Sequence, residues 1–332
     1  MKAIQFLGMT AFMAAMLTGC SNDSELAHSN FPDDNIIRVT AGVNGAVTRA
    51  ETLGTELNSD FKFSLTVVNE NEGTNKYTYR NKIFQKTGTE WRCSDILLWQ
   101  DAETPVAVAA LAPVINSWDF NNIYNNQDKF QIFEYVISEN QNPQKPGNDL
   151  LYYYKSNLVP KTALNSDGKL NIQFNHAFSM IDIIVTLGTE YSKKDNPINE
   201  VIVGGSKIRA TLDITNSKGV AYASTMGTNP ETDIITTPGT FTMAQTDLEN
   251  SKAAYSCILI PQTIDANKFK VTLKTSSKTY VWTSPDAITL EIGHRYTLEL
   301  KMGKDVVTAQ KGNISAGSWT EGTGSGSPLE TK

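Results

Sequence analysis

The sequence predicts an all-β protein with two β-sandwich domains in tandem. Short segments that alternate apolar and polar residues recur along the chain, turn-forming residues separate them, and no segment as long as an ordinary helix has a helical period. Strands of this length, with Asn, Gly, Ser and Thr in the turns between them, are typical of sandwiches. The length of 332 residues is enough for two domains of ordinary size.

The first predicted strand covers residues 37–43, and a period of two places Ile37, Val39, Ala41 and Val43 on one face of it. Asn44-Gly45 can bend or end this strand, since both residues tolerate positive φ. Further strands are predicted, in order, at residues 61–68, 76–80, 106–111, 151–154, 170–174, 178–187, 201–203, 207–214, 255–260, 269–275, 279–283, 288–292 and 295–302. The short polar links at 276–278 and 293–294 indicate hairpins.

Changes in composition predict the domain boundaries. The polar, turn-rich segment 159–169 separates two groups of strands, and residues 113–149 form the longest irregular region, which we expect to be a functional or mobile loop. The predicted organisation is a signal peptide at 1–19, a tether at 20–34, an N-terminal sandwich at 35–168, a C-terminal sandwich at 169–320 and a flexible tail at 321–332.

The N-terminus has the order of features of a bacterial lipoprotein signal. Lys2 gives a positive start, residues 4–17 form an apolar run, and small residues directly precede Cys20. The alternative is a transmembrane helix, but roughly 14 apolar residues are short of the ~20 that a span needs. We therefore expect cleavage before Cys20 and lipidation of its thiol, with the acyl chains holding the protein on a membrane.

The rest of the chain offers little material for catalysis. It has three histidines, His28, His176 and His294, and no nucleophile elbow, zinc helix or phosphate loop. Acidic residues are too numerous to select a catalytic pair without geometry. No basic run accompanies the net charge of −6, so no nucleic-acid partner is expected. The sequence predicts a protein that is not an enzyme and has no cofactor and no metal site.

Two questions remain open at this level. Cys93 and Cys257 are either a disulfide or two free thiols, because a separation in sequence says little about distance in space. Several aromatic residues either stack on sugars or lie in the core, and burial is the commoner fate. These are Trp99, Trp118, Tyr124 and residues 152–154.

Beyond these patterns, the chain resembles the fimbrillin-like (Mfa-like) proteins of Bacteroidetes. The resemblance rests on the lipobox, the alternating first strand, the Arg-Ala step near residue 50, the segment 174–181 (FNHAFSMI), the segment 255–263 (YSCILIPQT), the closing hairpin 279–302 and the step at 314–319 (ISAGSW). It implies two transthyretin-like, Greek-key sandwiches and a pilin exported as an outer-membrane lipoprotein. It also implies that an Arg-specific protease cuts between Arg49 and Ala50 and releases the first strand, after which the subunit becomes part of a fimbria at the cell surface.

The expected consequence of that cut follows from the alternation. If residues 37–43 line a core, their removal opens an apolar groove and bares a row of backbone groups. A strand from another pilin subunit can fill the groove, which is strand addition in trans. The expected partners are therefore other subunits, the Arg-specific protease and, through Cys20, the outer membrane.

The C-terminus leaves the subunit type open. In such a scheme the C-terminal segment of one subunit fills the next, yet residues 304–319 alternate poorly and offer only Val306, Val307, Ile314 and Trp319 as apolar candidates. The chain is therefore a stalk or a tip subunit. The alternative is a non-polymerising surface lipoprotein, a tip or accessory protein that binds a glycan or a host protein.

Overall fold

The computed structural model describes residues 30–44, 52–53, 56–57, 61–69, 76–114, 124–125, 129–142, 149–191, 193–214, 222–225, 230–246, 249–310 and 314–318. Within these residues the regular structure consists of strands, apart from one short helix, α1 (Pro160–Ala163), in the predicted boundary segment. The all-β fold class is confirmed. No helix in the described ranges is long and apolar enough to cross a membrane.

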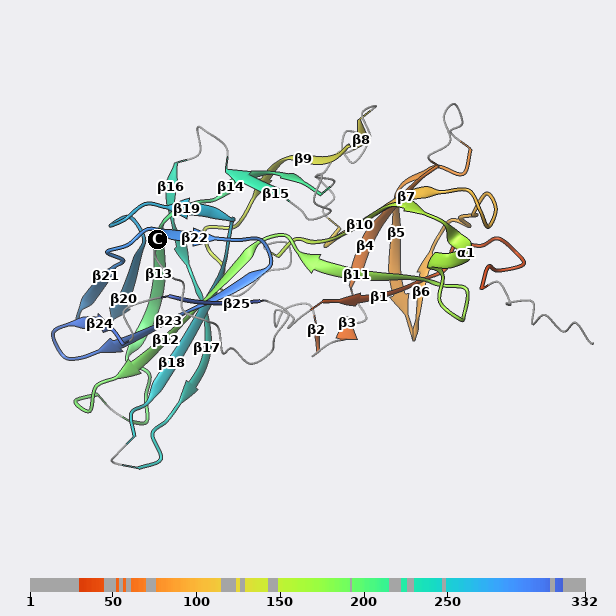
Figure 1. Cartoon of the computed structure of the whole chain (residues 1–332). Coiled ribbons are helices and arrows are strands. Elements are labelled where there is room, and N and C mark those ends of the chain that lie inside the picture. Colours follow the sequence, from red (N-terminus) through yellow and green to blue (C-terminus); the bar gives the residue numbers. More distant parts are fainter. Residues whose placement is uncertain are drawn as a thin grey trace, which may run out of the picture.

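One half of the molecule is built on a seven-stranded sheet (Figure 1). Its order is β1 (Val39–Val43), β11 (Leu170–His176), β10 (Leu151–Leu158), β7 (Val106–Ala112), β4 (Lys62–Asn69), β5 (Tyr79–Thr87) and β6 (Glu90–Cys93). In Figure 1, β1 and β11 run across the direction of β4 and β5. The backbone of Ile37 donates to the carbonyl of Leu97 at 2.8 Å, so the segment before β1 meets the segment after β6 and the sheet closes on itself at that end.

The other half is a sandwich of two larger sheets with smaller ones at its rim. One sheet has the order β17 (Thr237–Thr242), β18 (Lys252–Leu259), β12 (Ser179–Leu187), β23 (His294–Met302) and β24 (Val307–Ala309), with β25 (Ser315–Ser318) also paired to β23. The second has the order β16 (Glu231–Ile235), β13 (Ile198–Lys207), β20 (Lys270–Thr275) and β21 (Thr279–Thr283). At its rim β19 (Gln262–Ile264) pairs with β22 (Ile288–Leu290), while the other two-stranded pair, β2 (Thr52–Leu53) with β3 (Glu56–Leu57), lies beside β1 in the first half (Figure 1).

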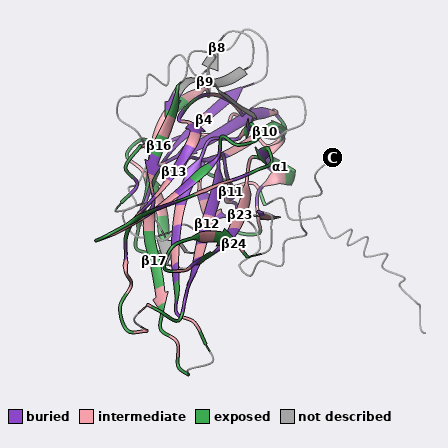
Figure 2. Ribbon diagram, turned by 90° about the vertical axis from the view of Figure 1, so that its left-hand side faces the viewer, coloured by how far each residue is buried: buried purple, intermediate pink, exposed green. Residues whose placement is uncertain are grey.

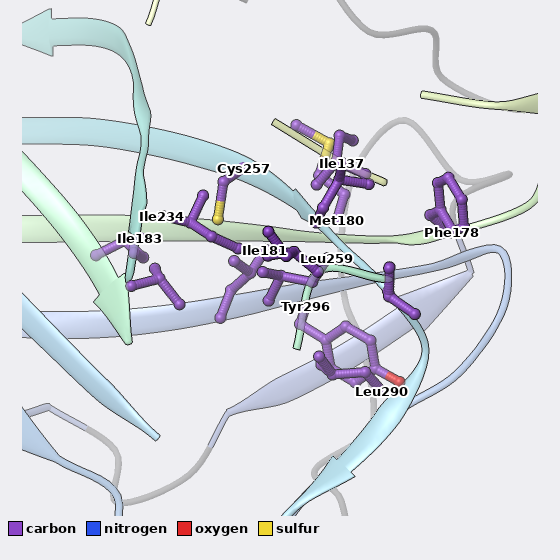
Figure 3. Close-up of a cluster of buried hydrophobic side chains, with 14 of the residues drawn as sticks. Ile137, Phe178, Met180, Ile181, Ile183, Ile234, Cys257, Leu259, Leu290 and Tyr296 are labelled. Carbon is purple, nitrogen blue, oxygen red and sulfur yellow. The ribbon is translucent and has the colours of Figure 1, made fainter. Parts of the chain in front are cut away.

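Two hydrophobic cores share strand β7. Every residue of β7 is buried; Val106, Val108, Ala110 and Ala112 face the first core, while the alternate residues face the second. The second core continues into the sandwich, where side chains from β12, β18 and β23 interdigitate (Figure 3). Figure 2 shows buried residues running through both halves. A strand that is apolar on both faces thus marks the layer where the two halves pack together.

The placement of β11 differs from the predicted domain division. Its buried residues Leu170, Ile172 and Phe174 belong to the first core, and it pairs with β1 and β10. The strands therefore change core after His176, later than the predicted division between residues 168 and 169. Alternation identified the strand, but a period of two gives a buried face without saying which sheet that face joins.

The long region predicted to be irregular contains strands that reach the other half. Within residues 113–149, β8 (Tyr124–Asn125) and β9 (Lys129–Val136) join β14 (Arg209–Asp213) and β15 (Tyr222–Thr225) in one sheet. The chain continues along the sandwich, where the buried amide of Gln141 donates to the Ile258 carbonyl at 2.9 Å and accepts from its N–H at 2.8 Å. This region is an inter-half connection, and the expectation of an irregular insert is wrong for its described strands.

Candidate functional site

The candidate site is β1 together with the slot that holds it. β1 pairs in parallel with β11, from Val39 opposite Leu170 to Val43 opposite Phe174. At the two ends of this ladder, Leu170 donates its N–H to the Arg38 carbonyl and Asn44 donates to the Phe174 carbonyl, both at 2.8 Å. These bonds fix the phase: the even-numbered backbone groups of β1 face β11, and the odd-numbered ones face away from it.

The odd-numbered side chains of β1 enter the first core. Ile37 and Val39 are each 4 % exposed and Val43 is 7 % exposed, while Ala41 is partly buried against the same cluster. In this core the ring of Phe63 packs edge-on against Phe174 and stacks on Phe84. All four residues predicted to face a core do so, but whether the strand can be excised stays a prediction.

On its outer face β1 is held by polar side chains. The hydroxyl of Thr40 donates to Asn171 Oδ1 at 3.1 Å, and Asn44 Nδ2 donates to Asn175 Oδ1 at 2.9 Å. These contacts join β1 to β11 and add nothing on the other edge. Within Val39–Val43 the ladder and these side chains join β1 to β11 alone, although β1 also contacts β3 and β6 without pairing with either strand.

The other edge of β1 borders a groove of about 490 Å³. The groove lies between β1 and β6, and its walls come from residues 36–41 and from residues 89–97. Backbone bonds close it at one end, where Ile37 meets Leu97 and Trp99 donates to the Asn35 carbonyl at 2.8 Å. Past that end no described strand pairs with the outer edge of β1. A core strand that borders a groove is unusual, because buried strands normally have neighbours on both sides.

An exposed ion pair braces the start of β1. Arg38 Nη1 donates to Asp34 Oδ1 at 2.9 Å, and the second guanidinium nitrogen reaches the other carboxylate oxygen. The hydrogen bonds from Arg38 and then from the Ile36 N–H lower the pKa of Asp34 to about 2. Because both side chains are well exposed, we treat this pair as a weak restraint on the strand.

The C-terminal segment lies on the opposite half, along one edge of β23. β24 pairs with the end of β23 (Met302 opposite Val307), and β25 pairs with its start (His294 opposite Ser318), both antiparallel. Of the apolar candidates, Val306 is 57 % exposed, Val307 is partly buried and Ile314 is 6 % exposed; Trp319 lies outside the described residues. This segment covers a sheet edge and contributes one fully buried side chain.

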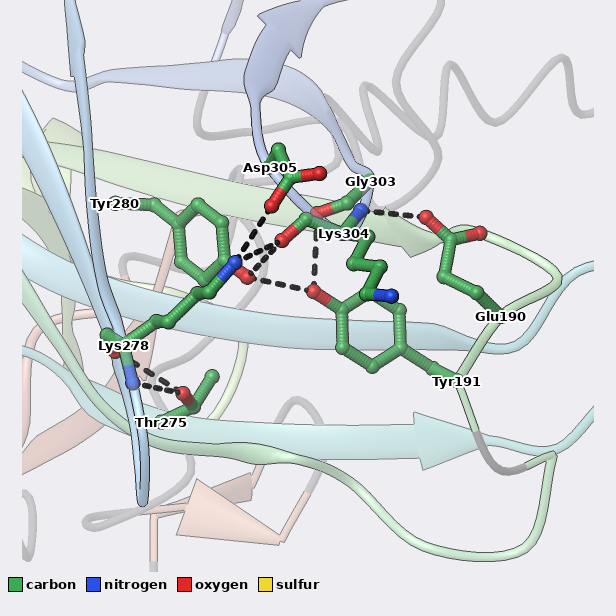
Figure 4. Close-up of polar contacts among 8 residues, drawn as sticks. All are labelled: Glu190, Tyr191, Thr275, Lys278, Tyr280, Gly303, Lys304 and Asp305. Atoms are coloured by element: carbon green, nitrogen blue, oxygen red, sulfur yellow. Dashed lines mark hydrogen bonds and ion pairs between the residues drawn. The ribbon is translucent and has the colours of Figure 1, made fainter.

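A polar cluster, the tyrosine clamp (Glu190, Tyr191, Lys278, Tyr280 and the turn Gly303–Asp305), fixes the beginning of that segment (Figure 4). The Tyr191 hydroxyl donates to the Gly303 carbonyl at 2.9 Å, and the Tyr280 hydroxyl donates to the Lys304 carbonyl at 2.8 Å. Lys278 Nζ pairs with Asp305 at 2.6 Å, and the Lys304 N–H donates to Glu190. The turn is held firmly, in contrast to the short strands that follow it.

Three residues of the predicted site, Cys20, Arg49 and Ala50, lie outside the described residues. Lipidation at Cys20 and cleavage between Arg49 and Ala50 therefore remain predictions. The question about the other cysteines is answered: Cys93 and Cys257 are free thiols, the first beside the first core and the second inside the other core. Burial raises the pKa of Cys257, so this thiol is unreactive at ordinary pH.

The histidines and aromatic residues take structural positions where they are described. His176 is buried, and its Nδ1 lies 3.0 Å from the carboxylate of Asp149; His294 contacts the carbonyl of Ile292 at 3.0 Å. Trp99 is 1 % exposed and belongs to the first core, so it cannot stack on a ligand. The described part of the chain brings together no group of three metal-binding side chains.

Sequence reasoning missed the groove. Its walls come from a predicted strand and from residues 89–97, for which no strand was predicted. A period of two shows which side chains are buried, but it carries no information on which edges of a sheet remain unpaired. The sequence offered no signal for it: Ile96 begins the apolar run ILLW, and its exposure of 74 % follows from the tertiary structure alone.

Comparison with known proteins found a family model and solved structures that are similar to this chain. The sequence model of a family described as fimbrillin-like matches residues 48–319. A candidate cell adhesion protein from Bacteroides ovatus is 19 % identical, with a TM-score of 0.59 over 84 % of this chain and 96 % of that one. A second, from Bacteroides uniformis, is 16 % identical, with a TM-score of 0.54 over 87 % of this chain and 100 % of the other.

A fimbrial protein from Bacteroides vulgatus is 14 % identical, with a TM-score of 0.50 over 86 % of this chain and 99 % of that one. No curated protein matches. Because these identities are below 20 %, the solved structures show only a shared fold. The match to the family rests on the sequence model. The family match begins after β1, so it neither includes nor tests the strand at the candidate site.

Proposed function

We propose, because this chain belongs to the fimbrillin-like family, that it is a structural or adhesive subunit of a cell-surface fimbria. In this proposal the chain is exported as a lipoprotein, lipidated at Cys20, and carried to the outer membrane. An Arg-specific protease then cuts between Arg49 and Ala50, β1 leaves, and a strand of another subunit takes its place. Neither catalysis nor a cofactor is part of this role.

One observation carries the proposal: β1 is both a core strand and an edge strand. Val39 and Val43 in the strand, and Ile37 shortly before it, are buried and each contribute roughly 1.5–3 kcal/mol by leaving water. Yet a single parallel ladder holds the backbone, and a groove borders the other edge. A strand with these properties stabilises the precursor while covalently attached and can be lost without disrupting any other strand pair.

Apolar burial and backbone hydrogen bonding also favour the binding of a new strand in the slot that β1 leaves. Loss of β1 exposes the apolar lining of the first core and the backbone edge of β11. An exposed edge above an apolar groove accepts an extended strand, with backbone bonds providing affinity and alternate side chains providing specificity. The free energy that β1 contributes before cleavage becomes available to the incoming strand, so assembly needs no nucleotide.

The test is limited digestion of the chain from residue 21 with an Arg-specific protease. We expect one cut before Ala50, identified by mass spectrometry of the new N-terminus, followed by multimers on a native gel. The matched control is Arg49→Lys, which keeps the charge and removes the cleavage site. A wild-type chain that resists the protease, or multimers that form equally in Arg49→Lys, would contradict protease-triggered assembly.

A second candidate is a non-polymerising tip or accessory lipoprotein that binds a glycan or host protein. It is favoured by the C-terminal segment, which pairs with its own β23 and is fixed at its start by the tyrosine clamp. Such a chain would donate no strand, would keep β1 in its slot and would stay monomeric. No cut at Arg49, or a cut that leaves a stable monomer still holding residues 21–49, would support this candidate over a stalk subunit.

A further inference from the structure

We propose that the outer edge of β6, with the groove beside it, is the entry site at which an extended strand of a second copy of this chain first pairs. The incoming strand binds there before β1 has left and then displaces it. This inference rests on the proposed strand exchange and adds where that exchange begins and in what order its steps occur.

The backbone of β6 presents free groups to the groove. β5 and β6 form a two-residue hairpin in which Thr87 pairs with Glu90, and Gly88, at φ 64°, supplies the positive φ that the turn needs. In such a hairpin the bonded pairs alternate, so Glu90 and Arg92 bond to β5. The N–H and C=O groups of Trp91 and Cys93 therefore point away from β5.

The edge of β1 that faces β6 also directs free backbone groups into the groove. Its even-numbered backbone groups bond to β11, which leaves those of Val39 and Ala41 directed toward the groove. Within the described residues no strand pairs with either edge, although both border the same groove. Parts of β1 and β6 have Cα atoms within 8 Å of each other, closer than the ~9.6 Å that a strand between them needs, so an entering strand first bonds to the part of β6 beyond this approach while β1 still occupies its ladder with β11. It then needs only a shift across the groove to replace β1.

The groove also offers apolar anchors for alternate side chains. Phe84 and Leu97 lie at its base and are each 2 % exposed, and Trp91 is partly buried against Phe63. Ile96 borders it with 74 % of its surface exposed, the largest exposure among the large apolar residues described. An apolar base between two unpaired strand edges is the arrangement that strand addition uses.

Charge favours another copy of this chain as the partner. The groove lining carries four cationic residues and two acidic ones, whereas the whole chain has a net charge of −6. The cations are Arg38, Lys86, Arg92 and Lys169. A basic groove on an acidic protein attracts a whole acidic copy during encounter, whereas the segment 36–44, which carries Arg38 and no acidic residue, gains nothing from this charge. The groove is also continuous with the slot of β1, whose shape already matches a strand of this chain.

The proposal predicts a particular kinetic order. If β1 had to leave first, exchange would be limited by its dissociation, and the rate would not depend on the concentration of the incoming strand. If the strand enters at β6, the rate rises in proportion to that concentration. A tenfold increase in strand concentration separates the two mechanisms, since the expected changes in rate are none and tenfold.

The experiment uses the full chain from residue 21 with residues 45–50 replaced by a site for a different specific protease, so that it does not depend on cleavage at Arg49. After the cut, the probe is a fluorescent peptide of residues 36–44, which is the β1 segment of a second copy. Uptake of the peptide and loss of the resident β1 are followed by fluorescence and mass spectrometry. A rate proportional to peptide concentration supports entry at β6.

Two pairs of variants test the location. Cys93→Pro removes an N–H that faces the groove. The ladder between β5 and β6 is kept, because edge strands accept proline where the N–H faces outward. Cys93→Ser is the control for loss of the thiol. Ile96→Asp removes the exposed anchor, and Val281→Asp, at a residue 56 % exposed on the distal strand β21, is its control. We expect Cys93→Pro and Ile96→Asp to slow exchange about tenfold and the controls to leave it unchanged.

The outcomes separate this inference from the proposed function. Exchange at a rate independent of peptide concentration, or equally fast in the groove variants and controls, overturns entry at β6 and leaves strand exchange standing. No exchange at any concentration overturns both. Intact folding of each variant is checked by its thermal transition. Failure of Cys93→Pro to fold shifts the test to the Ile96 pair.

Discussion

The first and last strands of the described chain close their respective halves in different ways. β1 inserts three side chains into the first core but has a strand neighbour on one edge only. The C-terminal segment, β24 and β25, lies over the edge of β23 and buries Ile314 alone among its large apolar residues. The first strand is thus a structural part of a core, and the last segment is a cover on a sheet edge.

This difference indicates separate roles for the two ends. A strand that fills a core leaves an apolar slot when it is removed, and such a slot binds a replacement strongly. A segment that covers an edge leaves mainly backbone groups exposed, which pair with many partners at lower affinity. If the proposed strand exchange occurs, we therefore expect the incoming strand to bind in the slot of β1, and we expect the C-terminal segment beyond the tyrosine clamp to detach at little cost.

The largest expected effect comes from a charge placed in the β1 slot. Val39→Asp buries a carboxylate without a partner, because the native side chain is 4 % exposed, and should destabilise the chain by about 4 kcal/mol or more. Val307→Asp, at the partly buried start of β24, should cost well under half of that. Urea denaturation of the two variants measures both values, and equal losses would show that the two ends do not differ as described.

A smaller effect is expected from the single buried anchor of the C-terminal segment. Ile314→Ala removes a side chain that is 6 % exposed and should cost about 2 kcal/mol, the lower end for such truncations, since an edge position can relax. Hydrogen exchange of the backbone groups in residues 314–318 should rise, while that of β1 stays unchanged. Faster exchange at β1 as well would mean that the two ends open together.

The tyrosine clamp should affect only the turn at the start of the C-terminal segment. Tyr191→Phe deletes the hydroxyl that donates to the Gly303 carbonyl and contacts Tyr280 at 2.8 Å, at a cost of about 1 kcal/mol. We expect proteolysis to begin earlier in the turn 303–306 and the slot of β1 to keep its affinity for the peptide of residues 36–44. Unchanged protease sensitivity would show that the clamp does not limit opening of this segment.

Much of this comparison could be predicted from the sequence. The alternation in residues 37–43 identified the four side chains that face the first core, and that in 170–174 identified β11. The partner of a strand is a separate matter, since faces follow from local periodicity while pairing depends on residues far away in the chain. The domain division was placed before β11 for that reason.

The missed strand β9 has a local cause. In FQIFEYVI every residue except Gln131 and Glu134 is apolar, and these two polar residues stand three apart, so the segment does not keep a period of two. The pairing accounts for this spacing: Leu212 lies opposite Ile132 and Ala210 opposite Tyr135, which puts one extra residue in β9. A β-bulge of this kind breaks the alternation on which prediction relies.

The smallest predicted effect concerns the ion pair at the start of β1. The pKa of Asp34 is lowered from 3.8 to about 2, chiefly by the hydrogen bond from Arg38, so the folded chain binds this proton more weakly than the unfolded chain. The stabilisation is therefore present above pH 3.8 and is lost as the pH falls toward 2. Release of β1 from the cut chain should accelerate slightly across that range.

In Asp34→Asn the carboxylate is absent at every pH, so release should be slightly faster at neutral pH and should lack this acid-dependent step. Asp305→Asn is the control, because Asp305 also forms an exposed pair, with Lys278 at the C-terminal segment, and its pKa is lowered by the same kind of bond. An effect of Asp305→Asn on β1 release as large as that of Asp34→Asn would show that general charge, and not the brace, sets the rate. If only Asp34→Asn changes the rate of β1 release, the ion pair restrains the start of β1 locally. The strand then leaves from that end less readily than from the end beside the cut.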